Sequence, residues 1–337
     1  HGASELRNPS NEFNTEYYLR TNKDVYYSRL NPLVHYIRFG KREGRMIEGG
    51  ENLYYCYQEP IYTEQITKNI LAFQSKPLIS IIMPVYNIDP KWLEKAIKSV
   101  ENQWYQNWEL CIADDCSTNQ QTKDFLSKIE NKKIKITFLK KNLHIPGATN
   151  EAMKLAEGDY FLFMDNDDEL TVDTLYENVK KINELQGNVD LLYADEDKID
   201  TEGYYCEPYY KPDYSPDRLL SQNYMVHPTV IKHALIEKIG GLEIGLEGAQ
   251  DYDIVLKATE NTEKIQHIRK VLYHWRKIPG SIALDINSKE YAYKSGKKAL
   301  ENALERRNLS AKVLFTKHPG IYRINYNINE NPLISII

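Results

Sequence analysis

The sequence predicts an α/β fold, in which a mostly parallel central sheet carries helices on both faces, plus a small N-terminal helical module. Three observations support this prediction. Short, nearly continuous apolar runs at 78–83, 108–113 and 160–164 are typical of strands buried on both faces of a parallel sheet. Segments with a helical spacing of apolar residues lie between such runs. Polar residues follow each run, at the end of the strand where such sheets bind ligands.

Length, charge and cysteine content narrow the class of protein. A chain of 337 residues suffices for one large and one small domain. The net charge of −5 gives no electrostatic basis for binding nucleic acid, and no apolar run approaches the length of a membrane span. Four cysteines without CxxC pairs favour a reducing compartment: Cys56, Cys111, Cys116 and Cys206. We therefore expect a cytoplasmic protein, and peripheral association with the inner face of the cell membrane stays open.

The expected small module covers residues 10–50. Residues 1–9 are set apart from the fold, because the chain begins without Met and its first residues read as a cloning remnant. A capped apolar run begins at Asn14, and a second run ends at Gly40, a natural helix stop. These features predict two short helices, in which His35 has a structural role. The tyrosine-rich residues 51–76 are expected to link this module to the main domain.

The main domain is expected to occupy residues 77–325. Its first strand, 78–83, is stopped by Pro84. The elements expected next are helix 92–103, strand 108–113, helix 122–129 and strand 134–139. This alternation predicts a doubly wound sheet, which binds ligands beyond the carboxyl ends of its strands, where the strand order reverses.

The acidic stretch Asp165–Glu169 directly follows the apolar run 160–164. Four carboxylates at the end of a buried strand repel one another unless a cation lies among them. Asp165 and Asp167 flank one residue and can both turn toward one hard divalent ion. The alternative is a solvated turn that opens the next helix, because acidic residues are favoured at a helix N-terminus.

Other classes of acidic site fit less well. A phosphatase-type Asp-x-Asp motif belongs on the opening strand, whereas this one follows three other strands. A calcium-binding loop starting at Asp165 needs Gly at its sixth position and Glu at its twelfth, where Leu170 and Tyr176 stand. A sugar nucleotidyltransferase needs a glycine-rich loop with basic residues at the first strand, and none is found there.

Several short motifs together resemble the family 2 glycosyltransferases of the GT-A fold. These motifs are PVYN at 84–87, ADD at 113–115, HIPGATNEA at 144–152, DND at 165–167, YADEDKID at 193–200, KPDYSPD at 211–217, EGAQDYD at 247–253 and YHWR at 273–276. The resemblance covers about residues 77–310. It is greatest to the branch that builds bacterial surface polysaccharides and glycoprotein glycans, including rhamnosyltransferase-like members. Residues 10–50 resemble a short helical element fused to bacterial sugar transferases.

The resemblance implies a metal ion and a general base. Asp167, together with Asp165 directly or through water, would hold Mn²⁺ or Mg²⁺ against the donor's diphosphate, and His274 would complete the site. Asp251 would take the proton of the attacking hydroxyl, with Asp253 as the competing choice. The family more often has Glu where this chain has Gln250.

The resemblance also implies a nucleotide-sugar site. Asp115 is favoured over Asp114 for the contact with uracil or ribose, and the alternative role for this pair is capping of the helix after Thr118. Relatives more often have Gly and Arg where this chain has His144 and Thr149. The diphosphate contact is therefore assigned to His144 or Arg276. The remaining residues assigned to donor binding are Pro84, Tyr86, Asn87 and Asn166.

Two further polar segments keep two interpretations each. The carboxylates of Asp195–Asp197 line the acceptor or donor side, or form a solvated strand end. The segment Tyr224–Pro228 packs beneath the site, or presents His227 to the acceptor.

The resulting hypothesis is an inverting, metal-dependent hexosyltransferase. It would move a sugar from a nucleotide donor, UDP in the first place and dTDP (as in dTDP-rhamnose) in the second, to a glycan, lipid-linked or protein-linked acceptor. The alternative is an inactive transferase-like module for binding or assembly. The last six residues, PLISII at 332–337, repeat 77–82 letter for letter. Residues 326–337 are therefore expected to be a linker and the first strand of a second transferase domain.

Overall fold

The computed structural model describes residues 13–28, 30–43, 45, 47, 55, 57–278, 290–328, 333 and 335. It divides the chain into two compact units, His1–Tyr57 and Gln58–Ile337. The start of the chain before Phe13 and most of the repeated PLISII stretch lie outside the described residues, so the expectations for them stay predictions. No helix of the described residues combines the length and apolar character that crossing a membrane requires.

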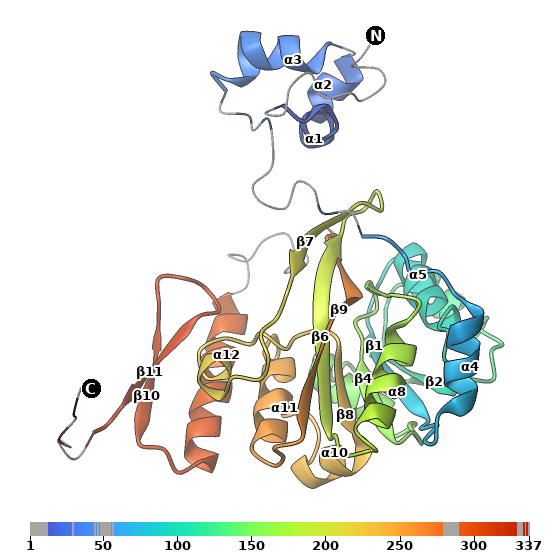
Figure 1. Ribbon diagram of the computed structural model, residues 1–337, viewed down its shortest axis with the longest axis vertical. Coiled ribbons are helices and arrows are strands. Elements are labelled where there is room, and N and C mark those ends of the chain that lie inside the picture. Colours follow the sequence, from blue (N-terminus) through green and yellow to red (C-terminus); the bar gives the residue numbers. More distant parts are fainter. Residues whose placement is uncertain are drawn as a thin grey trace. The chain divides into compact units, whose positions relative to one another are not determined.

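The N-terminal unit is a cluster of short helices, labelled in Figure 1. Its elements are α1 (Thr15–Thr21), α2 (Lys23–Ser28), α3 (Pro32–His35) and the π-helical turn η1 (Tyr36–Gly40). The side chain of Asn14 caps α1 by accepting a hydrogen bond from the Tyr17 N–H at 2.8 Å. Phe13, Tyr18 and Val25 form the core of the unit. His35 is buried there, 3.0 Å from the Tyr18 hydroxyl, which confirms its structural role.

The larger unit is built on one sheet of nine strands. Four parallel strands form one part of it in the order β3 (Ile134–Phe138), β2 (Trp108–Asp114), β1 (Ile79–Val85) and β4 (Tyr160–Phe163). The order then continues with β8 (Thr229–Lys232), β6 (Leu191–Ile199), β9 (Ile265–Arg276) and β5 (Glu169–Leu170), and β7 (Tyr205–Tyr209) pairs with β6. The pairs β4–β8, β8–β6, β6–β7 and β9–β5 are antiparallel, whereas β6 and β9 are parallel.

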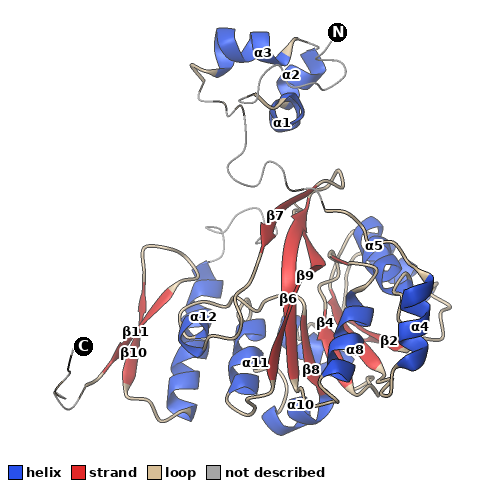
Figure 2. Cartoon of the chain, in the orientation of Figure 1, coloured by secondary structure: helices blue, strands red, loops and turns tan. Residues whose placement is uncertain are grey.

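Helices cover both faces of this sheet, as Figure 2 shows. Alternate residues of β1 face opposite sides, so that Ile81 and Met83 belong to one hydrophobic core and Ile82 to the other. The first core is covered by α5 (Pro90–Glu101) and α8 (Thr174–Glu184), with α4 (Glu64–Ala72) packed against it. The second core is covered by α7 (His144–Met153), α10 (His233–Ile239), α11 (Gln250–Thr259) and α12 (Glu290–Arg306). The predicted mostly parallel α/β architecture is confirmed.

Shorter elements complete the unit. They are α6 (Gln120–Ser127), α9 (Pro216–Leu219) and the hairpin β10 (Ala311–Phe315) and β11 (Tyr322–Tyr326). The strands β1 and β4 approach closely at Gly158, where an added Cβ would lie 2.7 Å from the Leu78 carbonyl oxygen. Glycine is therefore required at this position.

The first strand continues through Pro84 to Val85, two residues beyond its predicted end. Two carbonyls of β1 show which edge Pro84 faces: Ile82 O accepts from the Met164 N–H, and Pro84 O accepts from the Asn166 side chain. The missing N–H of Pro84 therefore points past Phe163, where β4 has already ended. No ladder hydrogen bond is lost, so the strand tolerates this proline.

The carboxylates of Asp195–Asp197 lie inside β6, and all three side chains are buried. Asp195 accepts from His267 Nε2 at 2.8 Å, and Glu196 pairs with Lys211 at 3.2 Å. Asp197 is hydrogen-bonded to His274. The interpretation as a solvated strand end is wrong, because each carboxylate has a buried cationic or imidazole partner.

Candidate active site

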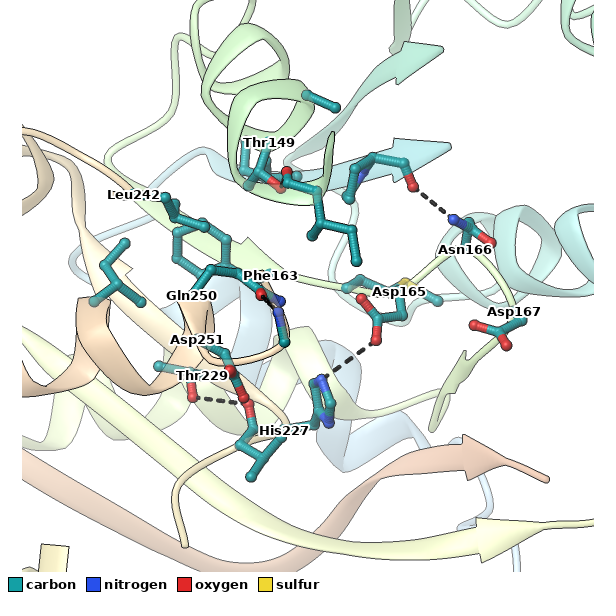
Figure 3. Close-up of a pocket in the computed structure, with 18 of the residues that line it drawn as sticks. Thr149, Phe163, Asp165, Asn166, Asp167, His227, Thr229, Leu242, Gln250 and Asp251 are labelled. Carbon is teal, nitrogen blue, oxygen red and sulfur yellow. Dashed lines mark hydrogen bonds and ion pairs between the residues drawn. The ribbon is translucent and has the colours of Figure 1, made fainter. Parts of the chain in front are cut away.

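A cavity of about 610 Å³ lies at the carboxyl ends of the parallel strands. The chain winds outward from β1 to β2 and β3, then returns to the other side of β1 as β4. The strand order therefore reverses between β1 and β4, and the cavity opens beyond their ends. Figure 3 shows that it is closed on other sides by the start of α11, by α7 and by the segment before β8.

The cavity brings together seven of the twelve residues assigned to a site by the sequence. Those that line it are Pro84, Tyr86, Asp115, Asp165, Asn166, Asp167 and Asp251. Asn87, Asp114, His144, His274 and Arg276 are not among the residues that line it.

Asp115 is held at the end of β2 by a backbone contact. Its carboxylate accepts a hydrogen bond from the Leu143 N–H at 2.6 Å. Burial is the main cause that raises its pKa. The neighbouring Asp114 points away from the cavity lining and accepts from the Ser117 N–H at 3.2 Å. The following helix, α6, is capped by Asn119, so neither aspartate has the capping role that was the alternative.

Asn87 supports this loop from the end of β1. Its side-chain oxygen accepts hydrogen bonds from the backbone N–H groups of Thr118 at 2.7 Å and Asn119 at 2.8 Å. Asn87 has a φ of 49°, a left-handed conformation that asparagine tolerates. It therefore joins two loops at the rim, rather than lining the cavity itself.

The acidic loop after β4 is anchored from below by Asp168. This side chain is completely buried and accepts from the Tyr273 hydroxyl at 2.6 Å and from the Arg276 N–H at 2.7 Å. Burial, followed by the charges of Asp167 and Asp165, raises the pKa of Asp168 well above its usual range. Both oxygens thus hold the loop, which leaves Asp165 and Asp167 facing the cavity.

Arg276 supports the same loop and does not reach the cavity, which corrects its assignment to the diphosphate. Its side chain is fully buried, with the guanidinium 4.6 Å from the centre of the Trp92 ring. Arg276 Nε donates to the carbonyl oxygen of Asp167 at 2.8 Å, and Nη2 donates to Glu169. Because the contacts of this guanidinium are all with protein groups, it can affect ligand binding only by holding the acidic loop in place.

Replacing Arg276 with Lys should loosen the acidic loop, because an ammonium cannot reproduce this fork of donors. We expect a lower melting temperature and a weaker affinity for nucleotide, by roughly tenfold, with the turnover number less affected. Calorimetry and steady-state kinetics measure these quantities. Nucleotide affinity equal to that of the unmodified chain would contradict the loop-supporting role.

His227 stands opposite Asp165 in the cavity, with Nε2 3.7 Å from Asp165 Oδ2 (Figure 3). Its ring stacks on Tyr273, with centroids 4.7 Å apart. Burial, and then the charge of Lys211, lower the pKa of His227 to about 3, so the ring is neutral at physiological pH. Its Nδ1 is buried and finds no hydrogen-bond partner among the described residues. A neutral imidazole of this kind can act as a metal ligand.

Within the described part of the chain, the ligand atoms that could share one cation come from Asp165, Asp168 and His227, and they lie within 4.8 Å of one another. Because both oxygens of Asp168 hold the loop, Asp165 and His227 are the better candidates. Asp167 lies apart from this pair in Figure 3. The structure does not bring His274 to the cluster, which corrects that assignment, since its ring is buried against Asp197 and Tyr205.

Asp251 enters the cavity from the first turn of α11. Its carboxylate accepts a hydrogen bond from Asn223 Nδ2 at 2.9 Å. Burial raises its pKa to about 6, close to the value that suits a general base at neutral pH. The competing Asp253 is completely buried and pairs with Lys257 at 2.8 Å and Arg306 at 3.5 Å. Of these two residues, only Asp251 lines the cavity.

Asn223 and Tyr291 escaped the sequence analysis. Asn223 directly precedes the segment 224–228, but only its contact with Asp251 reveals a role. Tyr291 lines the cavity from the start of α12, and no motif surrounds it in the sequence.

Replacing Asn223 with Ala should raise the pKa of Asp251, because the lost hydrogen bond stabilises the ionised carboxylate. A base must be ionised to accept a proton, so activity should fall as the pH drops through about 6 in the unmodified chain. We expect this acid limb to move upward by up to roughly one pH unit in the variant. A profile of kcat/KM against pH measures the shift, and an unchanged limb would show that Asp251 does not control it.

Comparisons with known proteins agree with this architecture. The sequence model described as Glycosyl transferase family 2 matches residues 80–239. The protein y4gI of Sinorhizobium fredii is 39% identical over 278 residues, which are 81% of this chain and 30% of that protein. The O-antigen biosynthesis protein RfbC of Myxococcus xanthus is 33% identical over 83% of this chain and 22% of its own length. This chain thus spans less than a third of either relative.

Two further comparisons are shorter or structural. WcaA of Escherichia coli, described as a colanic acid biosynthesis glycosyl transferase, is 33% identical over 55% of this chain and 67% of its own length. The crystal structure of Staphylococcus aureus TarS 1–349 in complex with UDP-GlcNAc superposes with a TM-score of 0.56, at 24% identity over 67% of this chain and 66% of that one. The chain therefore belongs to glycosyl transferase family 2, and its larger unit has the GT-A fold.

Proposed function

We propose that the chain is an inverting glycosyltransferase that uses a nucleoside diphosphate sugar as donor. The acceptor hydroxyl oxygen forms a bond to the anomeric carbon as the bond from that carbon to the diphosphate breaks. The hydroxyl proton passes to Asp251, and the nucleoside diphosphate leaves. Asp251 suits this role because it faces the cavity, is held by Asn223 and has a pKa of about 6.

The observation that carries the proposal is the charge of the cavity wall. Four aspartates line it, and none of the described lining residues is Lys or Arg: the four are Asp115, Asp165, Asp167 and Asp251. A diphosphate cannot bind in a cavity with such a wall unless a cation lies between them, because like charges at close range repel strongly in a partly buried site. The pair Asp165 and His227 would hold Mn²⁺ or Mg²⁺ there. Such an ion, when bound, stabilises the negative charge that develops on the leaving diphosphate.

The donor nucleotide is proposed to be UDP. Asp115 directly follows β2 and lines the cavity, as do Tyr86 and Ile145, and a carboxylate there can accept from the imide N–H of uracil or from ribose hydroxyls. TarS has the same fold and its crystal structure contains UDP-GlcNAc, which supports this choice. Thymine presents the same imide edge, so dTDP-sugars such as dTDP-rhamnose are the competing donors.

The acceptor is proposed to be a glycan or glycoconjugate hydroxyl in the synthesis of a bacterial surface polysaccharide. Relatives named for O-antigen and colanic acid biosynthesis support this assignment. Trp275 and Tyr291 also line the cavity, and they offer aromatic faces of the kind on which sugar rings stack.

A donor screen tests the proposal directly. Purified chain is incubated with UDP-, dTDP- and GDP-sugars, with Mn²⁺, Mg²⁺ or EDTA, and the released nucleotide is measured. We expect cation-dependent release from one UDP-sugar, slow with water and faster with an oligosaccharide acceptor. Nucleotide binding without release from any donor would instead indicate an inactive binding module.

A further inference from the structure

The N-terminal unit exposes more large apolar side chains than it buries in its core. Between Tyr26 and Phe39, six of them are 45–77% exposed: Tyr26, Tyr27, Leu30, Val34, Ile37 and Phe39. Its core, by contrast, consists of three fully buried apolar residues with a few partly buried neighbours. Exposed apolar side chains gathered on so small a unit mark a binding surface rather than a random feature of the surface.

The helical segment from Pro32 to Gly40 has two distinct sides. Pro32, His35 and Gly40 are buried against the rest of the unit. Val34 and Ile37 are exposed, and so are the basic residues at 38, 41 and 42. Residues three and four positions apart share a side of a helix, so the outer side carries apolar side chains followed by basic ones.

The positive charge on this side is not neutralised within the unit. Arg45 pairs with Asp24 at 2.7 Å and with Glu43 at 2.6 Å. Across the described part of the chain, Arg38, Lys41 and Arg42 have no acidic partner, and Arg42 donates only to the carbonyl oxygen of Arg38. Three uncompensated cations beside exposed aromatic and aliphatic groups are complementary to a surface that is both anionic and apolar.

We infer that this surface, defined as Tyr26, Tyr27, Leu30, Val34, Ile37, Arg38, Phe39, Lys41 and Arg42, binds a membrane containing anionic lipids. The apolar groups would enter the boundary between headgroups and acyl chains, and the cations would pair with lipid phosphates. The adjacent rings of Tyr26 and Tyr27, 5.4 Å apart, suit this boundary because tyrosine has an apolar body and a polar tip. The inference goes beyond the proposed transfer reaction, and it does not depend on which donor is used.

Vesicle sedimentation with the full chain tests the inference. We expect binding to vesicles of phosphatidylcholine mixed with phosphatidylglycerol, little binding to phosphatidylcholine alone, and loss of binding in concentrated NaCl. Replacing the three cations together (Arg38→Gln, Lys41→Gln, Arg42→Gln) should weaken the partition coefficient on the order of a hundredfold, since each basic residue contributes about 1 kcal/mol at an anionic surface. A Tyr27→Ser, Ile37→Ser variant should weaken it roughly tenfold or more.

A matched control removes the same charge elsewhere. Lys128, Lys132 and Lys317 are exposed residues of the larger unit, and their joint replacement by Gln should leave vesicle binding within about twofold. Equal losses in the two triple variants would overturn the inference, because net charge alone would then explain binding. Equal binding to neutral vesicles would overturn it as well. A third outcome would also overturn the inference: the chain binds no vesicle but associates with itself, and the Tyr27→Ser, Ile37→Ser variant abolishes this self-association. The salt dependence of the unmodified chain keeps the test valid if a variant fails to fold.

Discussion

The Asp251→Asn variant should lose two orders of magnitude or more in turnover while keeping its affinity for UDP. Asparagine has the shape of aspartate but cannot accept the proton of an attacking hydroxyl. The nucleotide is expected at Asp115 and the acidic loop, whereas Asp251 lies on α11 across the same cavity. Removing the carboxylate should therefore affect the chemical step and not donor binding. Single-turnover kinetics measure the first effect, and calorimetry with UDP and Mn²⁺ measures the second.

Two controls accompany this variant. Asp217→Asn removes a carboxylate from the exposed side of α9 and should leave turnover unchanged.

The thermal stability of Asp251→Asn provides the other control, since the pKa of Asp251 is raised to about 6 in the folded chain by burial. Because the pKa is higher in the folded state, the folded chain holds this proton more tightly than the unfolded chain does. The free energy of unfolding that this proton contributes is therefore lost as the pH rises through about 6. The variant should therefore gain thermal stability relative to the unmodified chain at about pH 8 and not at about pH 4. Lost UDP binding with an intact fold would place Asp251 in the donor site instead.

The Asp165→Asn variant should lose both cation binding and turnover, by roughly a hundredfold or more. Asp165 is the cavity-facing carboxylate that lies 3.7 Å from His227, whose neutral ring offers the second ligand atom. Without it, the diphosphate would meet an acidic wall with no cation to bridge them. Electron paramagnetic resonance of Mn²⁺ measures cation binding independently of activity.

Two further variants test whether the effect is specific to Asp165. Asp124→Asn changes an exposed carboxylate of α6 and should leave Mn²⁺ binding unaltered. Asp167→Asn tests the assignment made from the sequence, in which Asp167 is the principal ligand. If Asp167→Asn abolishes Mn²⁺ binding and Asp165→Asn preserves it, the pairing of Asp165 with His227 is not the cation site.

The sequence alone determined the architecture of the larger unit and the edge of the sheet that carries its chemistry. Buried parallel strands need continuous apolar runs, and their ends need polar turns, so both are visible in short stretches such as 78–87 and 108–115. The convergence of Pro84, Asp115 and Asp165 on one cavity follows from this local information, because parallel strands all end at the same edge.

Only the tertiary structure decided which of several similar side chains reach the cavity. His274 and Tyr273 are neighbours on β9, and successive side chains of a strand point to opposite faces, so the register places Tyr273 beneath the site and His274 against Asp197. Each face of β9 carries both polar and apolar residues, and its pattern therefore does not reveal this choice. His227 depends on the antiparallel insertion of β8 between β4 and β6, a pairing of segments far apart in the chain. Asp251 and Asp253 differ in the same way, since the helical turn directs one toward the cavity and the other toward Lys257.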